Sequence, residues 1–477
     1  MNKLNKNNLS DKKRSILLAV ILFGSFLAIL NQTLMLPALA GIMRDMNVNA
    51  NTVQWLTTGF MLVNGIMIPI TAFLINRFTN RRLFIGSMCI LTIGSLVGAL
   101  AVNFQMLLLG RLIQAVSVGI IMPMMQTLIL YMYPKEKRGY AMGLQGITIG
   151  FAPAIGPTLA GFIIDGLGWH YIFWLLIPLA IIDIIAAYFL MPNLMEKGNP
   201  KLDVPSIIMS TVGCGGVLYG CSIAGSIGWS EPVVFISIIV GLIGVALFAY
   251  RQLHLAEPFL VVSVLKNKSF FIGTVLAMVM FGLMIAGETL LPLYTQNALG
   301  HSALTAGLVL LPGALLAGIF SPVAGNIFDK YGPRILAITG TLITVASSFA
   351  FLLVRLETSL FLIATLYAVR IFGLTFVTMP VTTWALNCLE DKLIAHGTSV
   401  TSSFRQIFGS IITALIITAM TMGQKAFANP ESAEAMLHGF HNGMLLSACL
   451  AVGMLIISLI FVHDYEGIAA VNRDKKH

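Results

Sequence analysis

The chain has 477 residues, of which 57% are hydrophobic and only 10% are charged. Soluble domains carry about 25% charged residues, so this chain has too few charges to cover a water-facing surface of its size. The formal net charge of +9 is better explained by basic loops that orient a membrane protein than by nucleic-acid binding.

Fourteen apolar runs follow one another, each long enough to cross a bilayer as a helix, which takes about 20 residues. A β-barrel would instead have segments of about 10 residues with alternating polarity. The sequence therefore predicts an all-α integral membrane protein. The first run is too long for the apolar part of a signal peptide, so we assign it as the first span. The predicted spans are 15–37, 53–75, 83–102, 105–130, 140–164, 170–191, 205–225, 232–252, 270–293, 304–325, 335–354, 359–382, 397–421 and 441–463.

The lysines and arginines predict which side of the membrane each loop occupies. Of the 28 in the chain, 22 fall in segments that are cytoplasmic if both termini are inside, and three fall in external segments. Arg111, Arg370 and Arg405 lie inside spans. Because cytoplasmic loops carry the excess of basic residues, we expect a multi-pass protein of a bacterial cell membrane with both termini in the cytoplasm.

The chain contains an internal repeat. Residues 72–82 (AFLINRFTNRR) and residues 325–334 (GNIFDKYGPR) each join two spans by a short basic turn, and an arginine inside a span follows each of them. Two six-helix units that pack around a central path form a transporter architecture. The predicted organisation is a cytoplasmic tail (1–14), an N-terminal six-helix bundle (15–195), an additional hairpin (196–260), a C-terminal six-helix bundle (261–465) and a second tail (466–477).

Two further regions are classified by composition. The external segment 422–440 is polar and is predicted to be a long loop, partly ordered on the surface. The five cysteines have no motif spacing, so they are interpreted as small hydrophobic residues and not as disulfides or metal ligands. No nucleotide-binding motif and no hydrolase or zinc motif occurs, so no cofactor, no metal and no enzyme activity are expected.

A motif in the fifth span leads to a family resemblance. Residues 152–161 read APAIGPTLAG, close to the antiporter motif A-P-x-x-G-P-x-x-G-G, with Ala160 in place of a glycine. The chain resembles the major facilitator superfamily, and within it the fourteen-span drug:proton antiporters of the lincomycin-exporter-like branch. The resemblance implies two six-helix bundles with two extra central helices. The matched motif residues are Ala152, Pro153, Gly156, Pro157 and Gly161.

Prolines kink this helix, and its small residues permit close packing. We expect Gly156 and Pro157 to lie where the helix meets the other bundle; the alternative is a kinked packing helix with no role in exchange.

The two basic turns resemble the family's cytoplasmic gate loops. Ala72, Asn76 and Thr79 depart from the glycine, aspartate and glycine of the family pattern, which implies a weaker lock in the N-terminal half. Alternatively, these loops only set the topology. The gate candidates are Asn76, Arg77, Arg81, Gly325, Asp329, Lys330, Gly332 and Arg334.

The first and fourth spans carry polar residues that bear on coupling. A charge inside a span costs at least roughly 2.5–3.5 kcal/mol, so Arg111 is a functional candidate, or else it reaches the outer surface. Asn31, Gln32 and Thr33 occupy the position where most of the family has Asp-x-Thr. An asparagine cannot carry a proton, so the resemblance leaves the proton carrier to another residue.

Two carboxylates inside spans can take that role. Glu288 is favoured because its span corresponds to a cavity-lining helix of the family, and Asp183 is the alternative. Glu288, Arg111 and Asn31 lie at similar depths, so an ion pair between Glu288 and Arg111 is expected when the outside is closed.

The function predicted from these features is proton-coupled export of amphipathic or lipophilic compounds, often cations, with lincosamide antibiotics as a candidate class. A monomer in contact with membrane lipids is expected. The alternatives are export of an endogenous metabolite, lipid or peptide, uncoupled facilitation, and a non-transporting sensor or scaffold. Candidate substrate contacts are Trp55, Asn64, Gln114, Gln126, Phe281, Tyr294, Arg370 and Trp384.

Overall fold

The structure is a computed structural model that describes residues 11–195, 198, 203–229, 231–255, 258 and 260–463. Both predicted tails therefore lie largely outside the described residues. The helices are α1 (Asp11–Asp45), α2 (Ala50–Val53), α3 (Trp55–Arg77), α4 (Asn80–Ala99), α5 (Phe104–Met132), α6 (Arg138–Leu167), α7 (His170–Leu190), α8 (Val204–Ile227), α9 (Pro232–His254), α10 (Lys268–Leu293), α11 (Ala303–Tyr331), α12 (Pro333–Ala350), α13 (Leu360–Asn387), α14 (Ile394–Lys425) and α15 (Ala433–Phe461).

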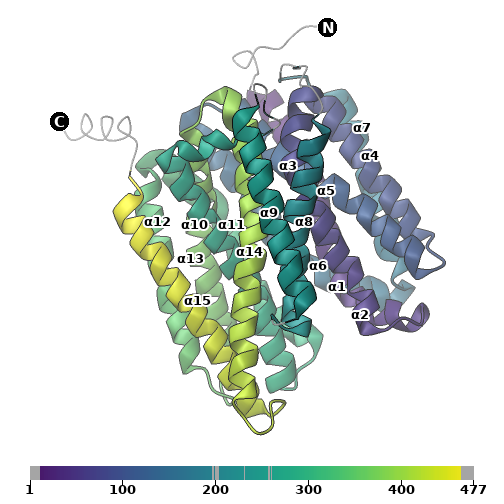
Figure 1. The fold of residues 1–477 in the computed structure, drawn as a ribbon, viewed down its shortest axis with the longest axis vertical. Helices are drawn as coiled ribbons and strands as arrows, with labels where there is room; N and C mark the ends of the chain where they lie inside the picture. The colour runs from purple at the N-terminus through teal and green to yellow at the C-terminus, as the bar shows by residue number, and fades with distance from the viewer. Residues whose placement is uncertain are drawn as a thin grey trace.

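The prediction of fourteen spans is confirmed. Fourteen of the described helices are long and apolar enough to cross a membrane, and only the short α2 is not among them. In Figure 1, α1 begins at the end of the bundle where α15 finishes. We call this the basic end, because the turns after α3, α5 and α11 that carry lysine and arginine lie there; the other is the opposite end.

The helices form two bundles, each with its own apolar core. One core draws chiefly on α1–α7 and the other on α10–α15. Equivalent helix pairs in the two bundles pack closely through glycines in the same way. A Cβ on Gly94 would lie 2.8 Å from the carbonyl oxygen of Gly110, and one on Gly340 would lie 2.6 Å from that of Gly373. Small residues let α4 approach α5, and α12 approach α13, closely enough for backbone contact, as expected for two copies of one unit.

The hairpin of α8 and α9 lies beside α14 in Figure 1 and contacts both bundles. The hydroxyl of Ser222 on α8 donates to Thr58 on α3, and the indole of Trp229 donates to Thr418 on α14 at 2.6 Å. A Cβ on Gly65 of α3 would lie only 2.3 Å from Leu218 of α8. The inserted hairpin thus covers the seam between α3 and α14.

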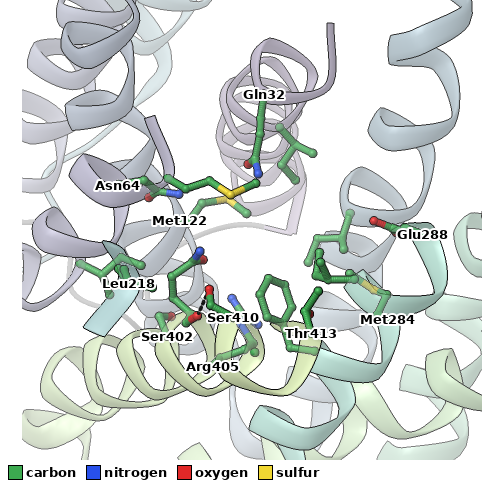
Figure 2. Close-up of a pocket in the computed structure, with 18 of the residues that line it drawn as sticks. Gln32, Asn64, Met122, Leu218, Met284, Glu288, Ser402, Arg405, Ser410 and Thr413 are labelled. Carbon is green, nitrogen blue, oxygen red and sulfur yellow. Dashed lines mark hydrogen bonds between the residues drawn. The ribbon is translucent and has the colours of Figure 1, made fainter. Parts of the chain in front are cut away.

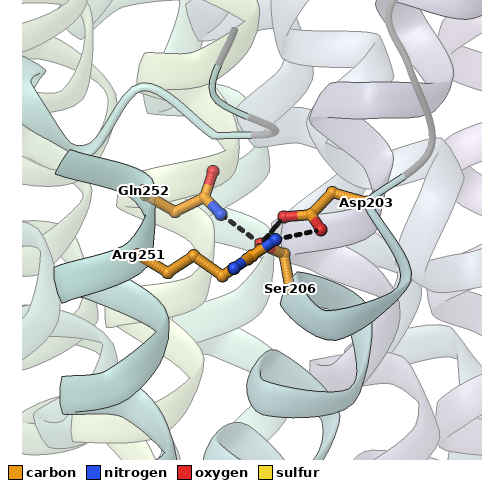
Figure 3. Close-up of polar contacts among 4 residues, drawn as sticks. All are labelled: Asp203, Ser206, Arg251 and Gln252. Atoms are coloured by element: carbon orange, nitrogen blue, oxygen red, sulfur yellow. Dashed lines mark hydrogen bonds and ion pairs between the residues drawn. The ribbon is translucent and has the colours of Figure 1, made fainter. Parts of the chain in front are cut away.

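A polar cluster ties the two hairpin helices together at the basic end (Figure 3). The Arg251 guanidinium donates to both carboxylate oxygens of Asp203, at 2.9 and 2.8 Å, the bidentate geometry that is strongest for this pair. Hydrogen bonding from Arg251 holds the pKa of the Asp203 carboxyl below its ordinary value. Gln252 donates to Ser206, which donates in turn to Asp203. Hydrogen bonds therefore fix α8 to α9 where the chain enters and leaves the hairpin.

The loop predicted at 422–440 is mostly helical, which corrects that expectation. α14 continues to Lys425, and α15 begins at Ala433. The Ser432 hydroxyl caps α15 by accepting a hydrogen bond from the backbone N–H of Ala435, and a capping serine stabilises a helix start by about 1 kcal/mol. Polar composition indicated a loop because helix ends that project beyond a membrane are also polar.

Candidate functional site

A cavity of about 380 Å³ lies between the two bundles. Residues of α1, α3, α5 and α6 line it on one side, and residues of α10, α13 and α14 on the other. Leu218, Cys221 and Ser222 of α8 complete its wall, so the hairpin contributes to the cavity directly. Most of the lining is apolar, which suits amphipathic molecules.

Two charged side chains of opposite sign line this cavity. Among the described residues that form its wall, Glu288 on α10 is the single acid and Arg405 on α14 the single base. Figure 2 shows them coming from different helices. Neither forms an ion pair within the described residues, although the Arg405 guanidinium lies 5.3 Å from the ring centre of Phe281. A titratable carboxyl and an unpaired cation thus face one space.

Glu288 also lines a second cavity of about 160 Å³. Thr33 of α1, Pro153 and Pro157 of α6, and Tyr367 of α13 share the walls of this smaller space. Glu288 therefore lies at the boundary between two cavities, against residues of both bundles. A change in its charge acts on helices of both halves at once.

Arg111 lies in the core of the N-terminal bundle and not in the cavity wall. Its guanidinium donates to the Asn31 side chain at 2.9 Å, to the Asn31 carbonyl at 3.2 Å and to Gln114 at 2.9 Å. It also lies 4.3 Å from the ring centre of Phe60. The ion pair between Arg111 and Glu288 was expected only when the outside is closed, whereas this structure is closed at the basic end, so the pair stays a prediction.

Arg370 is the counterpart of Arg111 in the C-terminal bundle. It is 1% exposed and donates to the Leu283 carbonyl of α10 at 3.1 Å and to the Ser447 hydroxyl of α15 at 2.7 Å. Each bundle therefore buries one arginine that binds a backbone carbonyl of its own first helix. We infer a packing role for Arg370 in place of the substrate contact considered above.

Asp183 is buried at 1% exposure, away from both cavities. A Cβ on Gly24 of α1 would lie 2.6 Å from its carboxylate, and Phe84 of α4 is next to it. Neither of its oxygens has a hydrogen-bond partner in the described structure. Without contact to the cavity it is a weaker candidate than Glu288 for coupling.

The cavity is sealed toward the basic end by contacts between the bundles. Both carboxylate oxygens of Asp329 accept hydrogen bonds from the backbone N–H groups of Gly139 and Tyr140 at 2.8 Å, at the start of α6. A helix N-terminus favours a negative charge. Arg138 donates to Asn387 at 2.9 Å and pairs with Asp391 at 3.1 Å. Asn76 also contacts His396, and Thr127 contacts Thr398, toward the same end.

Backbone contact between α6 and α11 continues the seal. A Cβ on Gly325 would lie 2.2 Å from the carbonyl oxygen of Gly139, and one on Gly143 would lie 2.6 Å from that of Ser321. A Cβ on Gly150 would lie 3.0 Å from the backbone nitrogen of Gly318. Glycines along one face of α6 thus permit the two halves to touch through their main chains.

Comparison with known proteins identifies the family. The model of the Major Facilitator Superfamily matches residues 21–414. The MFS-type transporter YcnB of Bacillus subtilis is 48% identical over 445 residues, which are 93% of this chain and 94% of that protein. The lincomycin resistance protein LmrB of Listeria monocytogenes is 39% identical, over 93% of this chain and 96% of that protein. The chain belongs to the major facilitator superfamily.

The fold agrees with this assignment. The solved structure of the proton:xylose symporter XylE superposes with a TM-score of 0.67 at 14% identity, and the match covers 97% of this chain and 100% of that one. The protein is therefore a multi-pass bacterial membrane transporter of the major facilitator superfamily and not an enzyme. No three His, Cys, Asp or Glu side chains among the described residues are grouped so as to hold a metal ion.

The antiporter motif of this superfamily member packs differently from our expectation. A Cβ on Gly156 would lie 2.1 Å from the hydroxyl of Thr33, which belongs to α1 of the same bundle. The expectation that Gly156 faces the other bundle is therefore wrong. Pro153 and Pro157 line the smaller cavity between the bundles, while nothing lies within 4 Å of a Cβ on Gly161. The motif brings α6 against α1 beside Glu288.

The two gate loops of the superfamily pattern differ for a structural reason. Gly332 has φ +83° in the turn between α11 and α12, a conformation that favours glycine. Thr79 is extended in the equivalent turn, where its side chain accepts a hydrogen bond from the backbone N–H of Arg82. Asn76 contacts His396 of α14, with 3.2 Å between the two nitrogens. The asparagine thus binds a side chain at the start of α14, as Asp329 binds the start of α6.

The remaining gate candidates have varied contacts. Arg81 donates to the Tyr188 carbonyl and lies over the Tyr188 ring. Lys330 lies in the last turn of α11, at the basic end. Arg77 and Arg334 each have an interaction in the structure. These residues lie at the basic end, but nothing in their contacts assigns them a gating role.

The substrate candidates separate by position. Asn64 and Phe281 line the main cavity, as does Gln32 of the polar site in the first span. Gln114 binds Arg111, and Tyr294 stacks on Phe440 in the core of the C-terminal bundle. The other two buried candidates, Gln126 and Trp384, lie outside both cavity walls, and the exposed Trp55 stacks on Tyr219 of α8.

Sequence reasoning missed four features. Arg405 was known only as an arginine inside a span, although a charge there is itself the signal of function. The ion pair of Arg138 with Asp391 joins residues 253 positions apart in the chain, and the contact of His396 with Asn76 joins residues 320 positions apart. The contribution of α8 to the cavity had no pattern in the sequence to indicate it.

Proposed function

We propose that this transporter exports amphipathic or lipophilic compounds in exchange for protons, with lincosamide antibiotics as one candidate class of cargo. The observation that supports this most is Glu288, the single acid in the wall of a mostly apolar cavity between the bundles. A carboxyl there exchanges a proton for a cationic group of the cargo, because both neutralise the same charge. Similarity to the lincomycin resistance protein LmrB motivates the choice of antibiotic.

Alternating access is the mechanism that fits this arrangement. The contacts of Asp329, Arg138 and the α6 glycines hold the basic end closed. Transport requires a second state in which these contacts separate and the opposite end closes. A ligand shifts such an equilibrium only by its different affinity for the two states. We propose that each chain works as a monomer, since both bundles that enclose the cavity belong to one polypeptide.

The transport assay uses purified protein in liposomes whose interior is more acidic than the exterior. Labelled lincomycin, the cationic dye ethidium and the zwitterion 8-aminooctanoate are offered outside. We expect accumulation of at least one compound about tenfold above that in liposomes without a gradient, and its loss when nigericin removes the gradient. If all three enter equally with and without the gradient, proton coupling is wrong.

We also propose that the basic end is cytoplasmic, as the distribution of basic residues indicates. Single cysteines in place of Pro430 and Asp474, in a chain without its own cysteines, are expected to react with an impermeant maleimide from outside and only after permeabilisation, respectively. Position 474 lies outside the described residues. Labelling in the reverse pattern would contradict the orientation.

A further inference from the structure

We propose that Arg405 is an anion-binding subsite of the central cavity, and that the cargo is an amphoteric molecule whose anionic group binds Arg405 while its cationic group binds at Glu288. This inference rests on the proposed transport function and narrows its cargo to molecules that carry both charges, in place of the lincosamides, which have a cationic amine and no anionic group. Four observations carry it: the missing partner of Arg405, the contrast with the other arginines inside spans, the surroundings of Arg405, and the position of Glu288.

Arg405 has no anion and no hydrogen-bond acceptor among the described residues. A guanidinium carries five N–H donors in a fixed plane, and those of Arg405 face the cavity. Its one recorded interaction is with the Phe281 ring, 5.3 Å from the guanidinium carbon to the ring centre. The guanidinium thus lies over an aromatic ring and in the cavity wall, where a ligand can reach it. An unpaired charge inside a membrane is costly, so a bound anion stabilises this site.

The fully buried arginines bind groups of the protein itself, although the Nε of Arg370 has no partner in the described structure. Arg111 binds Asn31 and Gln114, and Arg370 binds Ser447 and a carbonyl of α10. Arg138 pairs with Asp391. Each of these three is 1% exposed, and none lines the cavity. Arg405 is only partly buried, and it lines the cavity. The fold therefore provides partners for the structural arginines and leaves this one for a ligand.

The neighbours of Arg405 suit a carboxylate. Ser402 lies one turn earlier on α14 and lines the cavity, and its hydroxyl has no hydrogen-bond partner in the described structure. Residues three apart on a helix lie on one face, so Ser402 can donate to the anion that Arg405 binds. Met122, Met280 and Met284 supply apolar wall that adapts to the body of a ligand.

Glu288 indicates the second charge of the cargo. Phe281, which stacks on Arg405, precedes Glu288 by seven residues on α10, about 10 Å along the helix axis. A simple anion would bind more tightly when Glu288 is protonated, so it would move together with the proton. A cargo with a cationic group at Glu288 competes with the proton instead, which is what exchange requires. The two charges of the cargo should therefore lie about 10 Å apart.

The test compares three probes of equal chain length by isothermal titration calorimetry on the purified full chain in detergent: 8-aminooctanoate, octylamine and octanoate. The wild-type protein should bind the zwitterion at least about tenfold more tightly than either single-charge probe, since one charge-assisted hydrogen bond contributes about that factor. Arg405→Gln should weaken 8-aminooctanoate about tenfold without weakening octylamine. Glu288→Gln should weaken octylamine and tighten octanoate, because it removes the negative charge that repels an anion.

Two further variants keep the test decisive. Arg405→Lys retains the charge and should recover part of the affinity, while Arg355→Gln, a matched loss of charge on an exposed loop, should change nothing. Equal binding of the three probes by the wild-type protein overturns the inference, and so does an equal loss in Arg405→Gln and Arg405→Lys. These outcomes leave proton-coupled accumulation in liposomes unaffected, so the inference can fail while the proposed function stands.

Discussion

Glu288→Gln is expected to abolish accumulation driven by a pH gradient, with a loss of at least tenfold. Glutamine has nearly the shape of the protonated glutamate but cannot release a proton, so the cavity stays in one charge state. A carrier whose cavity charge never changes cannot favour one conformation at one pH and the other at a second. Labelled uptake into liposomes with an acidic interior measures this directly.

The controls separate coupling from damage to the fold. Glu434→Gln removes an exposed carboxyl at the start of α15 and should leave uptake unchanged. Asp183→Asn removes the buried carboxyl that lies outside both cavities and should have a milder effect than Glu288→Gln. Octanoate binding through Arg405 should persist in Glu288→Gln, which reports an intact cavity. Uptake at the wild-type level in Glu288→Gln would transfer the proton-carrying role to Asp183 or remove coupling altogether.

Gly156→Leu should reduce transport to background while the protein remains in the membrane. Its first side-chain atom would lie 2.1 Å from the Thr33 hydroxyl and 2.8 Å from the Thr33 Cβ, so α6 and α1 must separate. Overpacking of this kind costs about 1–3 kcal/mol, too little to unfold a protein of this size but enough to displace α1 beside Glu288. Uptake into liposomes and the amount of protein in membranes are the two measurements.

The matched control is Gly161→Leu on the same helix, where nothing lies within 4 Å of the added Cβ. This variant should transport normally, because the new side chain enters open space. A loss of transport in both variants would mean that α6 tolerates no leucine here, and the contact with Thr33 would not be the cause. Normal transport in Gly156→Leu would make the close approach of α6 to α1 dispensable.

The span count and the family could be predicted because they depend on composition and local motifs. Long apolar runs exceed the thickness of a bilayer, and APAIGPTLAG is a contiguous pattern. The rotation of each helix about its axis could not be predicted, since helices that are apolar all round carry no periodic signal for one face. Thus Arg111 and Arg405, both arginines inside spans, could not be told apart, although one binds Asn31 and the other faces the cavity.

Contacts between distant segments account for the other errors. Gly156 was expected at the interface of the bundles because small residues permit close packing. Pro157 and Gly150 of the same helix do lie there, but a helix turns by 100° at each residue, so neighbours face different partners. The departure of Asn76 from the family's aspartate suggested a weaker lock. Its contact with His396 becomes visible only when α14 is placed beside α3.

The inserted hairpin has a consequence for how the molecule moves. Ser222 and Leu218 attach α8 to one half through Thr58 and Gly65, whereas Trp229 attaches it to the other through Thr418. When the angle between the halves changes, one of these attachments must slide, while the Asp203–Arg251 pair keeps α8 and α9 together. We therefore expect three rigid bodies to move: the two bundles and the α8–α9 hairpin. At the seam between α6 and α11 the two bundles contact each other directly, so that seam can open by simple separation. At the seam between α3 and α14, α8 stays in contact with both helices while the angle between the bundles changes.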